Sequence, residues 1–545
     1  MRAPLLLAAL VALAAVLATA GARDGSFVYD DEYYLLKNPA VSGEADPWTS
    51  PLGEASQSLW RPLTVATWRW QWPATGPASA RPLLTANIAL HAAAAVLLML
   101  LARRFGLAPI PSAFAGLAFA VHPVHAEAVA WISGRSELLA CVFVLAAWCW
   151  HLTPGRPAAV AAALAVGLAA LSKENALIAP ALFVTADLWR RRRPLPWGRL
   201  ALQAGALAAV WLARASVLPQ LFPADDPPFA GLPLADRAFV AVQILGRSLG
   251  LLIWPAPLRV HYHRDELLVS APGALPLVLV TAAWVAWSLR RRRPTGLWLL
   301  LIPLALLPVL NLVPIGETFA ERFLYLPSAF FCLAVAGGLA ALARVERRGR
   351  GLGLSLVLGL LLLGAAWPAC RAAVSVWRDD LTLWAHAAAV APDDPHARYN
   401  HGMFLDAAGR HVTEDVTRPS AAHELSASLR LEPRHRYAGF AHQMLGNLAL
   451  AGTGAAAPNL SSAARHYREA LRLLPALGDA AVNLAVVSLQ APGLVPPDEA
   501  RAALERALAA ADLGTAARRA ARDLLVQLEA ASGSGATGTS SPDGS

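Results

Sequence analysis

Residues 82–101 read PLLTANIALHAAAAVLLMLL, an apolar run without a charged side chain, and Arg103 and Arg104 follow almost directly. An uncharged helix of this length spans the hydrocarbon core of a bilayer, which needs about 20 residues. Ten more apolar segments occur along the chain, at 4–20, 109–121, 136–153, 157–171, 175–189, 199–217, 273–289, 296–313, 323–343 and 352–370. We therefore predict an all-α fold that begins with a polytopic membrane helix bundle of about eleven spans over residues 1–370.

The composition supports a membrane protein. The chain has 545 residues, of which 56% are hydrophobic and only 15% charged, and its mean hydropathy is +0.46. The net charge of +9 is unevenly distributed, because residues 1–370 hold 30 Lys and Arg against 19 Asp and Glu, whereas residues 371–545 hold 16 against 18. The basic excess thus lies in the apolar part, where it reports topology. We expect the lipid bilayer as a partner and no nucleic acid.

Arginine-rich loops predict the orientation of the bundle. They contain Arg103 and Arg104, Arg156, Arg190–Arg193, Arg290–Arg293, and Arg344 with Arg347, Arg348 and Arg350. Because these loops alternate along the chain, the positive-inside rule makes them cytoplasmic and puts residues 21–81 and the chain after 370 outside. The stretch 238–256 would break the alternation if it spanned, so we predict that it is re-entrant or interfacial. Its polar Gln243 and Arg247 favour the same interpretation.

Residues 371–530 change to amphipathic helices. Three helix ends recur around Pro392, Pro433 and Pro475, with spacings of 41 and 42 residues. Small residues at the expected helix crossings and proline after the second helix resemble tetratricopeptide repeats lengthened by loop insertions. We predict an extracytoplasmic α-solenoid with a concave groove, followed by a disordered tail at 531–545. The solenoid either holds an acceptor or partner peptide or serves only as a spacer.

The first external loop, residues 21–81, carries an acidic pair. The segment FVYDDEYYLLKNP puts Asp30 and Asp31 about ten residues beyond the first span. Adjacent carboxylates repel each other, which raises one pKa and supplies a base near neutrality, whereas a solvated acidic turn is the alternative. The segment SLWRPLTVATWRWQW follows and predicts an interfacial helix that is anchored by tryptophans and carries Arg61.

The second external motif, HPVHAEAVAWISGR, occupies residues 122–135. It contributes His122, His125, Glu127 and Arg135. The pattern His-x-x-His-x-Glu is one way to hold a metal, but it is not the His-Glu-x-x-His arrangement of zincins, and Pro123 interrupts the helix. We therefore expect no metal and no cofactor. The alternatives are histidines that only cap a helix and an arginine that faces a lipid phosphate.

Two more motifs add charges to the same outer face. They are LSKEN, with Lys173 and Glu174, and ETFAERFLYLP, with Glu317, Glu321, Arg322 and Tyr325. A simple ion pair accounts for the first motif if it has no functional role. A charged side chain at the end of a membrane span is costly unless it binds a ligand or forms an ion pair. Arg322 is therefore a functional candidate, with Glu321 or Glu317 as its partner. Together the motifs predict one outward-facing polar pocket.

The order of these motifs resembles that of the transmembrane and tetratricopeptide-repeat O-mannosyltransferases, within the GT-C class of glycosyltransferases that use lipid-linked sugars. The resemblance runs from about 27 to 345 through FVYDDE, WRPLT, HPVHAEAVAWISGRSELLA, LSKEN and AERFLYLPS, and the repeats extend it to about 525. The repeats are few and stretched for that family. The resemblance implies a bacterial member, which is a multi-pass protein of the inner (plasma) membrane with a GT-C-like catalytic domain and extracytoplasmic repeats.

The resemblance also implies a reaction, in which a hexose, mannose in the family, passes from a polyprenyl-phosphate donor to a protein Ser/Thr or glycan hydroxyl with inversion. Asp30 or Asp31 is the implied general base. Arg135, Lys173 and Arg322 are the implied ligands of the donor phosphate. The implied pocket lining is Arg61, His122, His125, Glu127, Glu174, Glu321 and Tyr325, and Arg247, His261 and His263 line the lipid entry. A non-enzymatic membrane-anchored repeat scaffold for envelope proteins is the alternative.

Overall fold

The computed structural model describes residues 2–52, 58–72, 79–218, 227–269, 273–344, 350–412, 419–452, 457–510 and 513–534. Every regular element in these ranges is a helix and none is a strand, which confirms the predicted all-α class. The chain divides into two compact units, Met1–Leu383 and Trp384–Ser545. The first unit therefore extends past the last apolar segment, which we expected to end at 370, and includes the chain that leaves it.

All eleven apolar segments contain helices. They are α1 (Arg2–Thr19), α4 (Arg81–Arg104), α5 (Pro109–Ala120), α7 (Arg135–His151), α8 (Arg156–Ser172), α9 (Ala179–Trp189), α10 (Trp197–Val217), α13 (Ala274–Arg290), α14 (Pro294–Leu306), α15 (Tyr325–Ala343) and α16 (Arg350–Val376). In the described part of the chain, the helices at α1, α4, α7, α10, α15 and α16 are long and apolar enough to cross a membrane. A seventh arises if α5 and Pro123–Ala130, bent by 51°, form one span. These helices indicate a membrane protein, and the eleven crossings stay a prediction.

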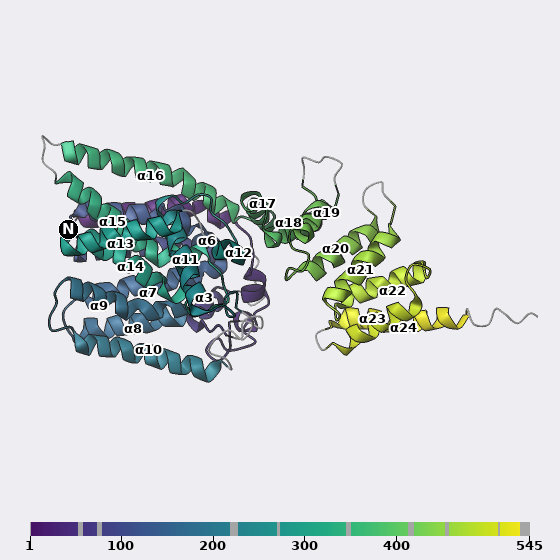
Figure 1. The fold of residues 1–545 in the computed structure, drawn as a ribbon. Helices are drawn as coiled ribbons and strands as arrows, with labels where there is room; N and C mark the ends of the chain where they lie inside the picture. The colour runs from purple at the N-terminus through teal and green to yellow at the C-terminus, as the bar shows by residue number, and fades with distance from the viewer. Residues whose placement is uncertain are drawn as a thin grey trace, which may run out of the picture. The chain divides into compact units, whose positions relative to one another are not determined.

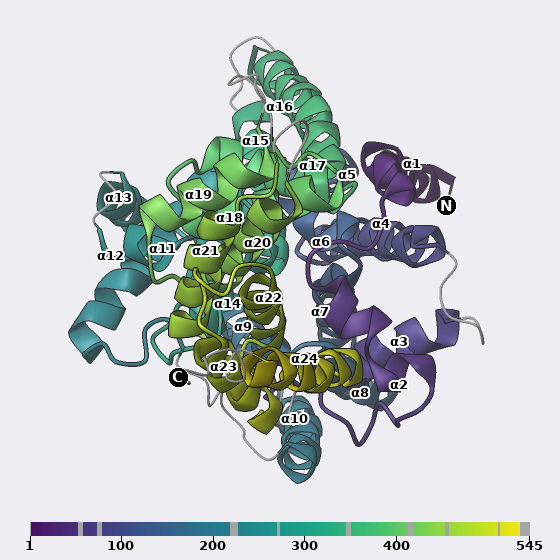
Figure 2. The same ribbon diagram turned by 90° about the vertical axis from the view of Figure 1, so that its right-hand side faces the viewer.

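Alanine-rich faces bring the helices of the first unit close together. Helix α4 packs against α1, α5 and α7, and the bundle continues from α7 through α8 to α10 (Figure 2). Ala94, Ala95 and Ala102 of α4 are fully buried. A Cβ atom on Gly116 of α5 would lie 2.9 Å from the carbonyl oxygen of Ala95, so a larger residue would push the two backbones apart. Such close contacts matter because apolar side chains gain little by leaving lipid.

Helix α11 (Leu234–Ile253) contains most of the stretch expected to be re-entrant or interfacial. It is an unbroken helix that packs against α13. Arg237 near its start donates to the carbonyl of Leu312 (Nη1–O 2.8 Å), and Tyr262 beyond its end accepts from Thr318 (O–Oγ1 2.7 Å). Both flanks of α11 are thus tied to residues 312–318, and the re-entrant or interfacial placement of the segment stays a prediction.

Three of the arginine-rich loops meet at one end of the bundle. Arg104 donates to the carbonyl of Cys149 (3.1 Å), and Arg199 donates to that of His151 (2.9 Å). The Arg190 guanidinium lies 5.1 Å from the centre of the Phe105 ring. The ends of α4, α7 and α9 and the start of α10 therefore share a side, as the alternation of arginine loops predicts.

Short helices gather at the other end of the bundle, where α3, α6 and α12 are labelled in Figure 1. They are η1 (Ala20–Asp24), η2 (Glu32–Leu36), α2 (Pro39–Ser42), α3 (Pro62–Gln71), η3 (Pro123–His125), α6 (Ala126–Ala130), η4 (Ile132–Gly134), η5 (Glu174–Ile178), α12 (Arg264–Leu268), η6 (Leu307–Val309) and η7 (Glu321–Leu324). Trp68 of α3 is buried in a cluster with Leu35, Val41 and Leu84. This end contains all the polar motifs singled out in the sequence.

The second unit is built from consecutive antiparallel-paired helices. They are α17 (Asp380–Val390), which begins in the first unit, α18 (Pro395–Ala407), α19 (Ala421–Leu431), α20 (Ala438–Ala451), α21 (Leu460–Leu473), α22 (Gly478–Gln490), α23 (Pro497–Ala509) and α24 (Thr515–Ser534). The pairs are α18–α19, α20–α21 and α22–α23. A Cβ on Gly402 would lie 2.8 Å from Leu425, and one on Gly446 would lie 2.6 Å from Tyr467, so glycine stands at these crossings. The pairing supports the predicted repeats, whose tetratricopeptide assignment stays a prediction.

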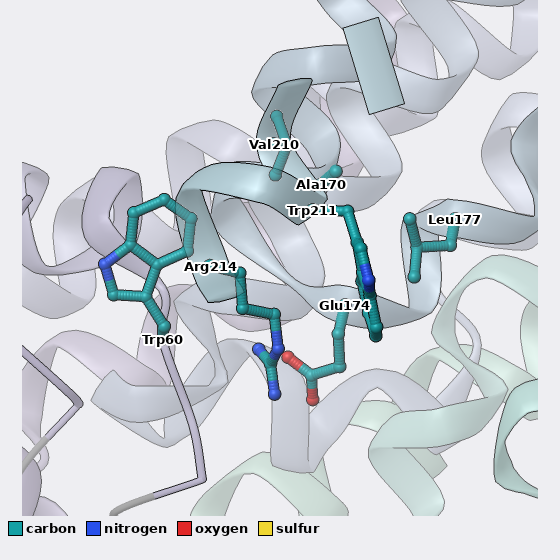
Figure 3. Close-up of a pocket in the computed structure, with 7 residues that line it drawn as sticks. All are labelled: Trp60, Ala170, Glu174, Leu177, Val210, Trp211 and Arg214. Atoms are coloured by element: carbon teal, nitrogen blue, oxygen red, sulfur yellow. The ribbon is translucent and has the colours of Figure 1, made fainter. Parts of the chain in front are cut away.

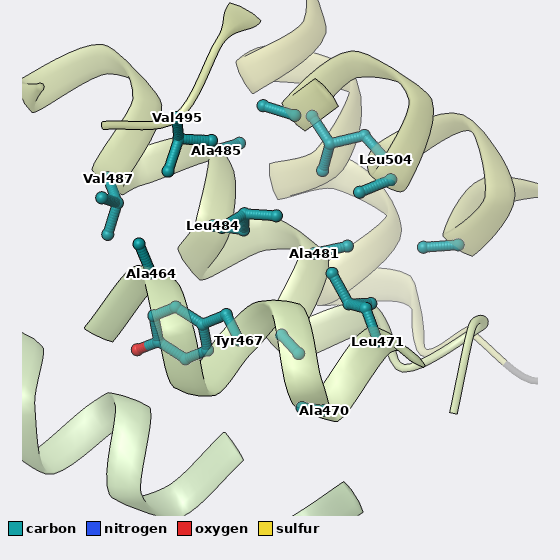
Figure 4. Close-up of a cluster of buried hydrophobic side chains, with 14 of the residues drawn as sticks. Ala464, Tyr467, Ala470, Leu471, Ala481, Leu484, Ala485, Val487, Val495 and Leu504 are labelled. Atoms are coloured by element: carbon teal, nitrogen blue, oxygen red, sulfur yellow. The ribbon is translucent and has the colours of Figure 1, made fainter. Parts of the chain in front are cut away.

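The last four helices of the second unit share one apolar core. Ala464 and Tyr467 of α21 meet Leu484 of α22 and Leu504 of α23 there, and all four side chains are buried (Figure 4). Helix α24 ends at Ser534, so it includes the start of the tail expected at 531–545, and the rest of that tail lies outside the described residues. The loop insertions that the repeat pattern predicts, at 411–419 and 452–459, also lie partly outside the described residues.

Candidate functional site

Asp31 anchors the first external loop. Its Oδ1 accepts hydrogen bonds from the backbone N (3.1 Å) and the Oγ (2.7 Å) of Ser133, and its Oδ2 accepts one from Val28 N (3.2 Å). Burial raises the pKa of Asp31 to about 7, although these hydrogen bonds lower it. Because the carboxyl has no exposed surface and its donors come from the protein, Asp31 holds the loop to residue 133.

Asp30 differs from its neighbour because it is only half-buried. The residue before it, Tyr29, has a φ of 58°, a left-handed conformation that is costly for an aromatic residue. Burial, Asp30 and Glu317 raise the pKa of the Tyr29 phenol well above its usual value near 10, and Arg322 lowers it. The charges of Asp30, Glu317 and Arg322 therefore all act on the partly buried Tyr29 side chain, which lies between the acidic loop and the last motif.

Arg322 is the centre of this group. Its Nη1 pairs with Glu127, its Nη2 lies 2.8 Å from Glu317 Oε2, and its backbone N donates to Glu127 Oε2 (2.7 Å). The guanidinium also lies 5.3 Å from the ring centres of both Trp131 and Phe323, an attractive arrangement for a cation. The Glu127 side chain is 1% exposed and that of Glu317 is 28% exposed. Glu127 is thus the buried partner of Arg322, and Glu317 is the more exposed one.

Lys173 brings a second cation to the same ring. Its Nζ pairs with Glu137 and lies 5.4 Å from the centre of the Phe323 ring. Burial lowers the pKa of Lys173, and the charge of Glu137 raises it. Lys173 and Arg322 therefore lie over the same Phe323 ring, and their role in a pocket stays a prediction.

Arg61 forms a bidentate pair with Glu174, with distances of 3.0 Å (Nε–Oε2) and 2.6 Å (Nη2–Oε1). Burial raises the pKa of Glu174, but Arg61 outweighs it and lowers this pKa to about 2, so the pair is ionised at neutral pH. A small recess adjoins the pair. It is lined by Trp60, Ala170, Glu174, Leu177, Val210, Trp211 and Arg214 (Figure 3).

Arg135 is occupied by internal partners. Its Nε donates to Asn87 Oδ1 (2.9 Å), its Nη2 to the carbonyl of Leu83 (2.7 Å) and its Nη1 to Thr67 Oγ1 (3.4 Å). The residue is 1% exposed. Arg135 thus ties α3 and α4 to α7, which argues against the predicted contact with a lipid phosphate.

His122, His125 and Tyr325 are buried among helices. His122 Nε2 lies 3.1 Å from a backbone carbonyl of α11, and His125 Nε2 lies 2.7 Å from Ser328 Oγ. The Tyr325 hydroxyl lies 2.8 Å from His91 Nδ1. These contacts support packing of the bundle more than lining of an open pocket. Across the described ranges, no group of three or more His, Cys, Asp or Glu is arranged to hold a metal ion.

Glu321 holds the chain that follows α11. Its Oε1 accepts from the Tyr262 hydroxyl (2.6 Å) and from Arg259 N (2.5 Å). The Arg247 guanidinium lies 5.0 Å from the centre of the Tyr262 ring. Glu321 therefore bonds to this segment. It does not pair with Arg322, so of the two partners predicted for Arg322 only Glu317 does. The role of Arg247 at the lipid entry stays a prediction.

The sequence analysis did not identify several residues of the site. Tyr29, Trp131 and Ser133 stand inside the quoted motifs, but an aromatic or hydroxyl side chain in a motif carries no signal of which charge it touches. Glu137 follows the second motif by two residues. Asp380, whose Oδ1 accepts from Tyr29 N (2.8 Å), lies far along the chain, and only the tertiary structure relates the two.

The fold and the site define a membrane protein whose charged residues converge at one end of an apolar helix bundle. The chain resembles the protein O-mannosyl-transferases, which confirms the resemblance predicted from the motifs. It is 26% identical over 473 residues to protein O-mannosyl-transferase TMTC4 of Mus musculus. That alignment covers 72% of this chain and 63% of the mouse protein. It is also 26% identical over 504 residues to TMTC1 of Homo sapiens, which covers 78% of this chain and 55% of that protein.

The chain spans less than two thirds of the length of these relatives. It is likewise 27% identical over 511 residues to Tmtc1 of Drosophila melanogaster, with 72% of this chain and 58% of that protein covered. No protein-family model matches the chain. No solved structure matches it either.

Proposed function

We propose that the chain is a glycosyltransferase that transfers a hexose, mannose by analogy with the names of its relatives, from a polyprenyl-phosphate donor to a protein Ser/Thr hydroxyl. The observation that carries the proposal is a chain of contacts at one end of an apolar bundle. Tyr29, the neighbour of Asp30, contacts Trp131, and Arg322 lies over the same ring. Arg322 and Lys173 both lie over the Phe323 ring. A base beside cations suits a reaction in which a hydroxyl loses a proton and a phosphate departs.

Asp30 is the general base in this mechanism. Its carboxylate accepts the proton of the acceptor hydroxyl while the hydroxyl oxygen attacks the anomeric carbon of the sugar. The bond from that carbon to the phosphate oxygen breaks, and the polyprenyl phosphate leaves with the bonding electron pair. A single displacement of this kind inverts the anomeric carbon. We assign the base to Asp30 because Asp31 is buried and engaged with Ser133 and Val28.

Arg322 and Lys173 stabilise the leaving phosphate. The phosphate gains one negative charge as the sugar departs, so fixed cations lower the energy of the transition state more than that of the bound donor. Glu317 is the partner that the donor phosphate replaces on Arg322, because its side chain is 28% exposed whereas that of Glu127 is 1% exposed. A lipid monophosphate carries less charge than a nucleotide diphosphate, so fixed cations can replace a metal. We therefore expect no required metal, and activity should persist after exhaustive chelation.

The remaining parts of the proposal concern the surroundings of the site. Arg61 and Glu174 line the pocket beside the recess of Figure 3, and Arg247 lies on the side from which the lipid enters. We propose that the site faces the extracytoplasmic side of a bacterial inner membrane, because the arginine-rich loops lie at the other end of the bundle. The helix pairs of the second unit hold the acceptor or a partner protein.

The test is transfer of mannose from polyprenyl-phosphate mannose to a Ser/Thr peptide by the purified full-length chain. Asp30→Asn should lower the rate by about 10²- to 10⁴-fold, the usual contribution of a general base, with an unchanged melting temperature. Asp24→Asn is the matched control, since Asp24 lies in the same loop with its side chain 73% exposed. A wild-type chain without transferase activity, or an Asp30→Asn variant as active as Asp24→Asn, would contradict the proposal.

A further inference from the structure

The chain that leaves the last apolar helix packs against the acidic loop. Ser26 donates through both its backbone N (2.9 Å) and its Oγ (3.1 Å) to the carbonyl of Arg378. Three residues later, Tyr29 N donates to Asp380 Oδ1 (2.8 Å). Two hydrogen-bonded points thus attach residues 26–29 to residues 378–380, which are more than 350 positions away in the sequence.

Aromatic rings hold the same turn from the side. The Tyr29 ring contacts Trp131 and Trp377 edge-on, with centroid distances of 5.5 Å and 6.4 Å. Trp131 and Trp377 stack on each other at 6.3 Å, and Arg322 lies over Trp131. Trp377 therefore completes an aromatic wall that reaches from the acidic loop to the central cation of the site.

Tyr29 needs such support because its backbone is strained. A φ of 58° is unfavourable for a residue with a bulky side chain, and such conformations persist only where the surroundings impose them. The hydrogen bond from Tyr29 N to Asp380 fixes the peptide on one side of this residue, and the two tryptophans fix its ring. Asp30 is the next residue, so its direction depends on the backbone of Tyr29.

Asp379 and Asp380, the two acidic residues at the start of α17, have different hydrogen-bond partners. Asp379 Oδ1 accepts from Thr382 N (2.8 Å) and caps α17. Because Asp379 satisfies the helix end, the Asp380 side chain is not needed there and reaches Tyr29 instead. Two adjacent carboxylates of the same chemistry therefore have separate partners, and Asp379 provides a matched control for Asp380.

We propose that Asp380 is a positioning residue of the candidate site, which acts through the Tyr29 backbone to hold Asp30 in place, and that Trp377 completes the wall beside Arg322. The inference rests on the proposed function for its effect on rate, but the contact itself does not depend on it. Trp377 and Asp380 both belong to the first unit, so the contact lies within that unit.

The experiment compares Asp380→Ala with Asp379→Ala in the purified full-length chain. Hydrogen exchange of a peptide covering residues 26–33 reports the Tyr29 amide, and it should be faster in Asp380→Ala than in wild type or Asp379→Ala. In the mannose-transfer assay, kcat should fall about 10- to 100-fold in Asp380→Ala, because a misplaced base costs that much, while KM for the donor stays within about twofold. Asp379→Ala should keep the wild-type kcat.

Each outcome decides a separate point. Equal exchange and equal kcat in the two alanine variants overturn the inference. Faster exchange in Asp380→Ala together with an inactive wild type refutes the proposed function and leaves the positioning contact standing. If Asp380→Ala does not fold, Asp380→Asn and Asp379→Asn replace the pair. The neutral amide weakens the bond to Tyr29, so equal exchange and equal kcat in the two asparagine variants overturn the inference as well.

Discussion

Gly134→Ala tests whether packing of the second motif sets the position of the acidic loop. A Cβ on Gly134 would lie 2.5 Å from the carbonyl oxygen of Ala128 and 2.9 Å from its C and Cα atoms. All three are backbone atoms, so no side chain can rotate away. To reach an ordinary contact of about 3.4 Å, the turn must shift by about 0.9 Å. Overpacking of this kind typically costs about 1 to 3 kcal/mol, and we expect the upper end of that range.

The same shift threatens the anchor of Asp31. The hydrogen bond from Ser133 Oγ to Asp31 Oδ1 is 2.7 Å long, and Ser133 is the residue before Gly134. A displacement of about 0.9 Å stretches it to about 3.6 Å, beyond hydrogen-bond range. Gly134→Ala should therefore lower both the melting temperature and the transfer rate.

The assay is a thermal melt of the detergent-solubilised chain, followed by the transfer assay at a temperature where both variants are folded. Gly338→Ala is the control, because a Cβ there meets no atom within 4 Å and alanine favours a helix. We expect Gly338→Ala to be as stable as wild type or slightly more stable. A Gly134→Ala variant with the melting temperature and rate of Gly338→Ala would refute the reasoning.

Two further predictions concern the buried charges. Glu137→Gln leaves Lys173 buried without its counter-charge, so the free energy of unfolding should fall by about 3 kcal/mol. The same thermal melt measures it. An unchanged free energy of unfolding would mean that Lys173 has another partner or is neutral. Asp31 has a pKa of about 7 in the folded chain against 3.8 for the free side chain, so its neutral form favours folding. The stability of wild type relative to Asp31→Asn should thus be highest below about pH 4, decrease by up to about 4 kcal/mol as the pH rises to 7, and then stay level. A difference that does not vary with pH would contradict this pKa.

The sequence was informative about the fold because its signal is local. An uncharged run such as 82–101 satisfies its own backbone hydrogen bonds only as a helix, and it finds a favourable environment only in a bilayer, whatever its neighbours are. The helix pairs of the second unit follow from amphipathic periodicity and from glycine at the crossings, which are local features as well. The placement of α11 is not a local feature, because Arg237 near its start bonds to a loop 75 residues away in the sequence.

The candidate site was predictable as a group of charges at one end of the bundle, but not as a set of roles. The motifs brought Arg322, Lys173 and the acidic pair to the same face, which requires only the parity of the spans. Arg135 looked equivalent to Arg322 in the sequence, yet one guanidinium is surrounded by internal acceptors and the other by carboxylates and rings. Whether a charged side chain is satisfied by internal hydrogen bonds depends on residues that are distant in the sequence. The spacing of residues in a motif does not show it.

The amino-acid sequence by itself determined that this chain is an all-α membrane protein with its chemistry near the ends of apolar helices, since hydropathy and charge act locally along the chain. Only the tertiary structure separated Asp30 from Asp31. The two carboxylates are adjacent and identical in chemistry, but Ser133 and Val28 bury one of them, while Asp380 holds the turn that presents the other. That difference comes from desolvation and from hydrogen bonds between residues far apart in the chain, which exist only once the helices have packed.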